Sequence, residues 1–294
     1  MLVLMPVLFS SNLIIGKGAL ETMEPTTLIY WRWVVATLVL IAIAGQSLTT
    51  HAAVLLRLTP LLLGLAVLGM VICGAGVYIA LRHTTATNGT LIYTTSPAFI
   101  VLFEMLIGRR PFSIRQFLGI VLATIGVAVI VFHGNLADAL STGLNPGDLG
   151  MLAGAISWAV YSVILHDRRL QALPDRAVLA SIAICAVVAL TPVWLIGGWR
   201  GGLVPASTDN WLAVAGVALM PSVLAYLSYQ WLVRQVGAAV TGMALYFLPI
   251  CGVSLAAIFL HEQVHLYHLF GTLLTLGGVI VATRLARQPD PAPA

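Results

Sequence analysis

The feature that most constrains this chain is that part of it occurs twice. Residues 82–132 match residues 234–284 when the sequence is shifted by 152 positions, without a gap. The aligned pairs include Arg82 and Arg234, Ala86 and Ala238, Pro97 and Pro249, Gly119 and Gly271, Leu122 and Leu274, and Gly126 and Gly278. Because both copies must form the same substructure, the repeat restricts the fold before any residue is given a role.

The composition places the repeated unit in a membrane. The 294 residues are 60% hydrophobic and 8% charged, whereas about 25% of residues are charged in a typical soluble domain. A helix crosses the hydrocarbon core with about 20 apolar residues. Such spans are predicted at residues 2–20, 26–45, 59–81, 89–107, 114–132, 148–166, 176–197, 210–232, 238–260 and 264–284. We therefore expect an all-α integral membrane protein with ten transmembrane helices, as a single domain over residues 1–288 with a disordered tail at 287–294.

The two copies are expected to have opposite orientations in the membrane. The third to fifth predicted spans repeat as the eighth to tenth. Because the copies are an odd number of spans apart, the second copy enters the membrane from the opposite face. The predicted fold is therefore two inverted five-helix repeats, one at about residues 1–134 and the other at about 148–286. Inverted repeats are typical of secondary transporters, which bind substrate near the bilayer midplane between the halves.

The positive charges predict the orientation of the chain. With the N-terminus in the cytoplasm, ten Arg residues lie on the cytoplasmic side, whereas only Lys17, Arg82 and Arg200 lie outside. This asymmetry follows the positive-inside rule, so both termini are expected in the cytoplasm. The basic residues thus report topology, and no nucleic-acid partner is expected. The sequence leaves the oligomeric state open and is compatible with a monomer.

The repeated motifs resemble a known family. The fourth helix of each half carries Pro97 or Pro249, and the fifth opens with a G-x-x-L-x-x-x-G pattern. Together with Pro25, Arg32 and Glu262, these residues resemble the EamA family of the drug/metabolite transporter superfamily, and within it the YddG-type amino-acid exporters. The resemblance covers nearly the whole chain. It implies a transport domain that works by alternating access in a bacterial cytoplasmic membrane.

A competing motif lies between the last two predicted spans. His261, Glu262 and His265 match H-E-x-x-H, in which two His on one helix bind zinc and the Glu acts as general base. The alternative function is therefore an intramembrane zinc metalloprotease. Such a site needs a continuous helix, whereas these residues lie at the end of a span, where the first copy has Arg110 in place of Glu262. We expect a solvated turn, with no metal, no cofactor and no enzyme activity.

Arg32 and Glu104 are charged residues predicted inside spans, where charge is costly and usually functional or paired. Arg32 is predicted about 10 Å below the outer edge of the second span. We expect it to pair with helix-end carbonyls or with Glu21 or Glu24, and contact with substrate is the alternative. Glu104 is predicted about one turn from the cytoplasmic end of the fourth span. It is expected to pair with Arg109, with proton coupling as the alternative.

Neutral polar and aromatic residues are the predicted lining of the substrate pathway. Trp158 and Tyr161 are one turn apart in the sixth span with Ser157 beside them, and they are expected in the cavity. The candidate binding residues on other spans are Ser10, Asn12, Tyr78, Tyr93 and Tyr246. An aromatic belt at the membrane interface is an equal alternative for Tyr78, Tyr93, Tyr226 and Tyr229.

Pro97 and Pro249 are the predicted gating residues. Each lies in the middle of an apolar run and removes a helix hydrogen bond. They are expected to act as hinges or as static kinks.

We expect a secondary transporter whose partners are a small-molecule substrate and the lipid bilayer. Amide, hydroxyl and indole groups suit a zwitterion, and an aromatic face holds a cation by about 0.5–2 kcal/mol. Export of amino acids, especially aromatic or apolar ones, is therefore expected, with flat cationic drugs as further substrates. A sugar or nucleoside permease of the same superfamily is the alternative.

Overall fold

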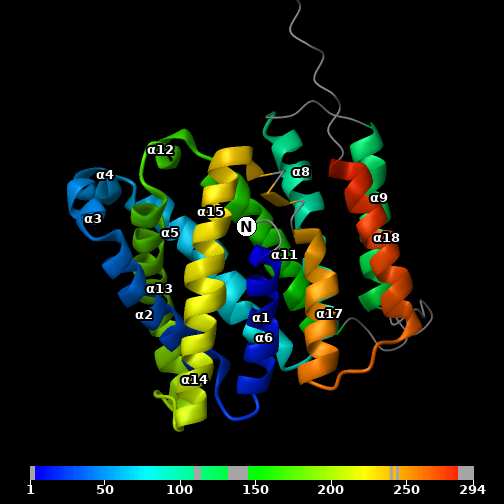
Figure 1. Ribbon diagram of the computed structural model, residues 1–294, viewed down its shortest axis with the longest axis horizontal. Coiled ribbons are helices and arrows are strands. Elements are labelled where there is room, and N and C mark those ends of the chain that lie inside the picture. The colour runs from blue at the N-terminus through cyan, green and yellow to red at the C-terminus, as the bar shows by residue number, and fades with distance from the viewer. Residues whose placement is uncertain (1–3, 109–113, 132–144, 239–240, 243–244, 284–294) are drawn as a thin grey trace, which may run out of the picture.

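The structure, a computed structural model, describes residues 4–108, 114–131, 145–238, 241–242 and 245–283. Within these ranges the chain forms helices and connecting turns with no strand, which confirms the all-α prediction. The longer helices run side by side (Figure 1). The tail predicted to be disordered at 287–294 lies outside the described residues.

Helices lie in every range predicted as a span. In chain order they are α1 Leu4–Ala19, α2 Pro25–Ala44, α3 Gln46–Thr50, α4 Ala52–Arg57, α5 Thr59–Ala66, η1 Val67–Gly76, α6 Val77–Leu81, α7 Ala86–Tyr93, α8 Ser96–Leu106, α9 Ile114–Val131, α11 Pro146–Leu165, α12 Arg168–Gln171, α13 Asp175–Gly201, α14 Thr208–Val217, η2 Ala218–Leu224, α15 Ala225–Val236, η3 Leu245–Phe247, α17 Leu248–Phe259 and α18 Leu266–Thr283. The short helices α3, α4 and α12 lie in connections between predicted spans.

Several of these helices are candidate membrane spans by their length and composition. Six helical segments of the described chain are long and apolar enough to cross a bilayer, namely Pro25–Ala44, Thr59–Leu81, Ala86–Leu106, Pro146–Leu165, Asp175–Trp199 and Thr208–Val236. The apolar helices Leu4–Ala19 and Phe117–Ile130 are shorter. The count of ten crossings and the inversion of the repeats stay predictions.

Capping residues determine where several helices begin. The side chain of Thr85 accepts a hydrogen bond from the backbone N–H of Asn88 at 3.0 Å, at the start of α7. Asn145 accepts from the N–H of Gly147 at 2.8 Å at the start of α11, whose first residue is proline. Each cap satisfies a backbone donor that has no partner within its helix. A proline in the first turn loses nothing there, because the N–H it lacks would have been unpaired.

Irregular helical turns occur at equivalent places in the two halves of the chain. Wide π-helical turns form η1 within the third predicted span and η2 within the eighth. Helix α7 ends at Tyr93 and α8 begins at Ser96, and the shift of 152 places the boundary between η3 and α17 at the equivalent position. Pro97 and Pro249 are therefore in the first turns of α8 and α17, which corrects the expectation that they lie in the middle of continuous helices.

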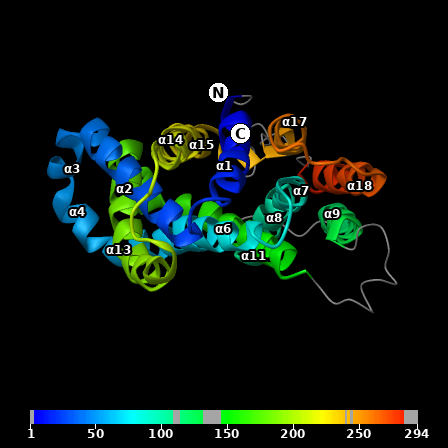
Figure 2. The same ribbon diagram turned by 90° about the horizontal axis from the view of Figure 1, so that it is seen from below.

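Close packing of small residues joins α9 to α18. A Cβ atom added to Gly126 would overlap the backbone of Thr275 and Gly271, and one added to Gly278 would overlap the backbone of Ala123 and Gly119. Gly126 thus lies near the start of α18 and Gly119 near its end, so the two helices are antiparallel. Figure 2 shows this pair at one end of the molecule, with α2 and α13 packed together toward the other end.

Candidate functional site

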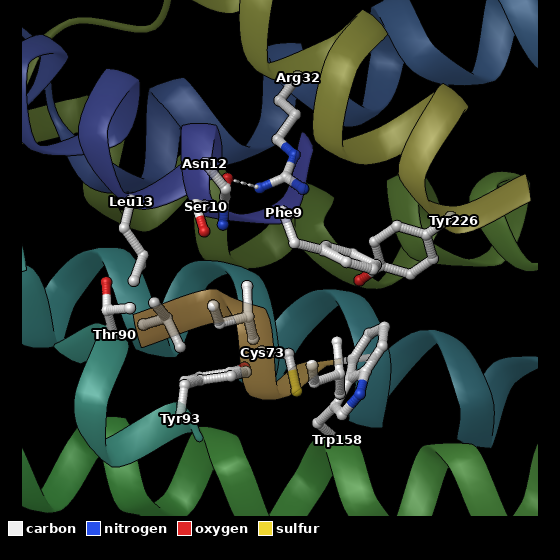
Figure 3. Close-up of a pocket in the computed structure, with 13 residues that line it drawn as sticks. Phe9, Ser10, Asn12, Leu13, Arg32, Cys73, Thr90, Tyr93, Trp158 and Tyr226 are labelled. Carbon is white, nitrogen blue, oxygen red and sulfur yellow. Dashed lines mark hydrogen bonds between the residues drawn. The ribbon is translucent and has the colours of Figure 1, made fainter. Parts of the chain in front are cut away.

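A cavity lies among α1, α2, α7, α11 and α15 (Figure 3). Its lining residues are Phe9, Ser10, Asn12, Leu13, Arg32, Cys73, Val77, Thr90, Tyr93, Trp158, Tyr226, Leu245 and Leu248. The volume open to the centres of water molecules is about 60 Å³, which is room for only a few waters. In this conformation the side chains must therefore move to admit a metabolite.

Arg32 projects into this cavity from α2. It is 2% exposed, and three helices supply its partners. Nε donates to Ser222 Oγ at 2.5 Å, and Nη1 donates to Asn12 Oδ1 at 2.6 Å and to the Tyr78 hydroxyl at 2.9 Å. The guanidinium carbon also lies 5.4 Å from the ring centroid of Trp33. All of these partners are neutral.

The prediction that Arg32 pairs with helix-end carbonyls or with Glu21 or Glu24 is wrong. Glu24 forms its ion pair with Arg82 at 2.9 Å, and no carboxylate of the described residues forms an ion pair with Arg32. Ser222 is a partner that the sequence did not indicate. It lies in the π-helical turns of η2 and donates back to Val217 O, which leaves its oxygen lone pairs available to Arg32.

Three hydrogen-bond donors at the cavity have no partner among the described residues. One is Arg32 Nη2, because the bonds of Arg32 use only Nε and Nη1. A second is Asn12 Nδ2: Arg has only donors, so Asn12 must present Oδ1 to Arg32, and Figure 3 shows its nitrogen turned toward the cavity. The third is the Ser10 hydroxyl, which is fully buried and unpaired. The cavity therefore offers donors without matching acceptors.

Aromatic rings form the opposite part of the lining. Trp158 is stacked on Tyr161 with ring centroids 5.1 Å apart, and Phe9 and Tyr226 contact Trp158 edge-on at 5.4 Å each. Trp158 is 4% exposed. Tyr226 donates to the backbone carbonyl of Gly69 in η1 at 2.6 Å. These rings provide an apolar surface facing Arg32 across the cavity (Figure 3).

The structure brings together some of the predicted binding residues and places others behind them. Ser10, Asn12, Arg32, Tyr93 and Trp158 line the cavity. Tyr161 and Ser157 are not among the lining residues of the cavity. Tyr161 is fully buried and stacks on Trp158, and Ser157 Oγ donates to Leu68 O at 2.9 Å. Tyr78 supports Arg32 and Asn12 from outside the lining. The side chains of Tyr246 and Pro249 lie outside the described residues.

The four tyrosines predicted to lie either in the cavity or in an interface belt are inside the helix bundle. Tyr78 and Tyr229 are fully buried, Tyr226 is 4% exposed, and Tyr93 lines the cavity. Tyr229 donates to Ser162 Oγ at 2.7 Å. The alternative prediction, that these tyrosines form a belt at the membrane interface, is therefore wrong for all four. The sequence alone did not indicate Phe9, Cys73 or Thr90 as lining residues, because apolar helices bury many such side chains.

The loop that contains the H-E-x-x-H motif is not helical. Residues 261–265 lie between α17 and α18, and His261 has a positive φ of 53°. Glu262 accepts hydrogen bonds from the backbone N–H groups of Ala86 and Thr87 at 2.8 Å each, at the start of α7. A protease site would need the two His and the Glu on one continuous helix, and residues 261–265 do not form one. Glu262 is instead bonded to the N-terminus of α7, so the geometry does not support the protease alternative. The prediction of a solvated turn is only partly right, because the Glu262 carboxylate is bonded to α7.

Glu104 is a second buried charged residue. It lies on α8 and is 6% exposed. Its expected partner Arg109 lies outside the described residues, so the ion pair and the proton-coupling alternative both stay predictions.

Both the sequence and the fold of this chain match those of known proteins. The model of the EamA-like transporter family matches residues 1–132 and 145–284. A solved crystal structure has the same fold, with a TM-score of 0.68 and 20% sequence identity, over 97% of this chain and 96% of the other.

Several curated relatives align along most of their length. An uncharacterized transporter of Archaeoglobus fulgidus is 24% identical over 98% of both chains. The uncharacterized transporter YyaM of Bacillus subtilis is 23% identical over 94% of this chain and 90% of the relative. The uncharacterized inner membrane transporter YedA of Escherichia coli is 27% identical over 85% of this chain and 78% of the relative.

Proposed function

The chain belongs to the EamA-like transporter family of the drug/metabolite transporter superfamily, and from this premise we propose that it exports small amphipathic metabolites by alternating access. Amino acids with aromatic or apolar side chains, as for the YddG-type exporters, are the proposed substrates. The site is a membrane cavity with polar donors on one side and aromatic rings on the other. Cationic drugs with flat rings are further candidates for the aromatic side.

The observation that carries the proposal is that both halves of the chain line one cavity. Residues from α1, α2 and α7 come from the first half, and Trp158, Tyr226 and Leu248 come from the second. A site between two halves can open to either face when the halves rock against each other. The narrow volume of about 60 Å³ is consistent with a conformation in which the substrate path is constricted.

The packing of α9 on α18 supports the proposed inversion. Shifting the sequence by 152 positions turns the contact of Gly126 with Gly271 into the contact of Gly278 with Gly119, and both contacts occur. Two equivalent helices that exchange in this way are related by a two-fold axis. Because the helices are antiparallel, that axis is perpendicular to them and would lie in the membrane plane. We therefore propose ten spans as two inverted halves, with both termini on the cytoplasmic side of a bacterial inner membrane.

The ion pairs of the two copies support the same symmetry. Arg82 pairs with Glu24 at 2.9 Å, and its repeat equivalent Arg234 pairs with Asp175 at 2.8 Å. Each pair joins the start of one helix to the end of another within its own half. The same connection thus recurs at opposite ends of the bundle.

An exchange assay tests the proposed function. Purified protein in liposomes preloaded with unlabelled amino acid is expected to accumulate the same labelled amino acid, faster for phenylalanine or leucine than for serine. Sugars, nucleosides and cationic dyes form the comparison panel. Exchange of a sugar or nucleoside without exchange of any amino acid would support the permease alternative and contradict the proposal.

A further inference from the structure

We propose that Arg32 binds the carboxylate of the transported substrate, with Asn12 and Ser10 as additional donors. The inference deepens the proposed function and rests on it, since it assigns a charge to the substrate of the same cavity.

The site contains a buried positive charge. A guanidinium is permanently charged, and a buried charge is costly unless it is paired. Arg32 is 2% exposed and has only neutral partners, namely Asn12, Tyr78 and Ser222. The protein thus keeps a buried cation for which the described residues supply no anion. A substrate anion would complete the pair.

Hydrogen bonds hold the donors of the site in a fixed arrangement. Tyr78 donates to Asn12 Oδ1 at 2.6 Å while accepting from Arg32 Nη1 at 2.9 Å. These bonds fix the guanidinium and turn Arg32 Nη2 and Asn12 Nδ2 to the cavity side. The buried Ser10 hydroxyl, which is unpaired, belongs to α1 two residues before Asn12 and lines the same space. A carboxylate has two oxygens that together accept several hydrogen bonds, so it matches a cluster that consists of donors.

Aromatic rings form the opposite side of the cavity. Trp158, Phe9 and Tyr226 face the space beneath the guanidinium (Figure 3). A ligand whose carboxylate binds Arg32 would place its remaining atoms against these rings. The class of substrate assigned by the site is therefore a small carboxylate with an apolar or aromatic side chain. A purely structural Arg would instead have its donors satisfied within the protein.

Two matched ligands test this assignment by equilibrium binding. 3-Phenylpropanoate and 3-phenylpropanamide have nearly the same shape and differ in the carboxylate. Isothermal titration of the full-length protein in lipid nanodiscs is expected to give affinity for the acid roughly 10- to 100-fold above that for the amide, the range for charge-assisted hydrogen bonds. Equal affinities of the wild-type protein for the two ligands would overturn the proposal.

Variants separate ligand binding from structure. Arg32→Gln is expected to reduce the affinity for the acid to that for the amide and to leave the amide within about twofold of its wild-type affinity. Arg169→Gln is the control, because Arg169 is exposed and pairs with Asp167 at 2.9 Å; it should keep the preference for the acid. A loss of acid and amide binding by the same factor in Arg32→Gln would indicate a structural role and contradict the proposal.

A second variant decides the question if Arg32→Gln does not fold. Asn12→Asp places a carboxylate next to Arg32 Nη1, where Asn12 Oδ1 now lies at 2.6 Å. This built-in anion pairs with the guanidinium and should favour folding while it abolishes the preference for the acid. A folded Asn12→Asp protein that still prefers the acid would overturn the proposal. Preference for the acid without exchange of any amino acid would overturn the proposed amino-acid export alone.

Discussion

At the scale of single residues, Trp158 is the aromatic side chain with two separable roles. It lines the cavity, and it also contacts Phe9, Tyr161, Tyr226 and Tyr229. Trp158→Ala is therefore expected to lower the free energy of unfolding by roughly 3–5 kcal/mol, as for other large buried side chains. It should also reduce transport of aromatic substrates more than transport of small ones, because the apolar wall is lost. Thermal unfolding and substrate profile would be measured on the same protein.

The control for this variant is Trp199→Ala. Trp199 is 87% exposed, so its truncation should change neither thermal stability nor the order of substrates. If Trp158→Ala reduced transport of every substrate by one factor, Trp158 would be a packing residue and not part of the binding surface.

At the scale of elements, the start of α7 depends on a residue from a distant loop. Glu262 accepts from the N–H groups of Ala86 and Thr87, which are donors that the helix itself cannot satisfy. Glu262→Ala is expected to lower the free energy of unfolding by about 0.5–2 kcal/mol, as for loss of an N-cap, and Glu262→Gln by less. Chemical or thermal denaturation in detergent measures both.

The exposed Glu21 provides the matched control, since Glu21→Ala removes a carboxylate without such bonds. The same experiment addresses the protease alternative. Tightly bound zinc at one ion per chain, lost in Glu262→Gln together with peptidase activity, would contradict the role described for this loop.

The contact between α9 and α18 gives a sharper test because the sequence supplies its own control. A Cβ at Gly278 would overlap the backbone of Ala123, whereas one at the neighbouring Gly277 would have no atom within 4 Å. Gly278→Ala is expected to destabilise the protein by about 1–3 kcal/mol through overpacking. Gly277→Ala should be neutral or stabilising, since alanine favours the helix. Equal unfolding temperatures for the two variants would contradict the close packing of these helices.

The sequence predicted the elements better than it predicted the site. Apolar runs and turn residues were enough to locate helices, because a span of about 20 apolar residues is a strong pattern. The partners of Arg32 could not be predicted in this way. Asn12, Tyr78 and Ser222 come from three other helices, and Ser222 faces Arg32 from the π-helical turns of η2. The direction of a side chain after such turns does not follow from α-helical periodicity.

For the molecule as a whole, the proposed inverted arrangement predicts which loops face which side of the membrane. In a background without the three native cysteines, a cysteine at Arg168 is expected to react with an impermeant reagent only from the cytoplasm. A cysteine at His265 should react only from outside. Labelling of intact cells and inverted vesicles measures this. Reaction of both positions from the same face would eliminate the inverted topology.

The buried charge of Arg32 also has an electrical consequence for the entire carrier. Arg32 keeps a positive charge in the cavity, and moving one charge through the membrane potential changes its free energy by about 2.3 kcal/mol per 100 mV. The negative interior of a cell therefore favours the state of the empty carrier in which Arg32 is connected to the cytoplasm. In an exporter with this site, the membrane potential would drive the empty carrier back to the conformation that is open to the cytoplasm, where it binds its next substrate.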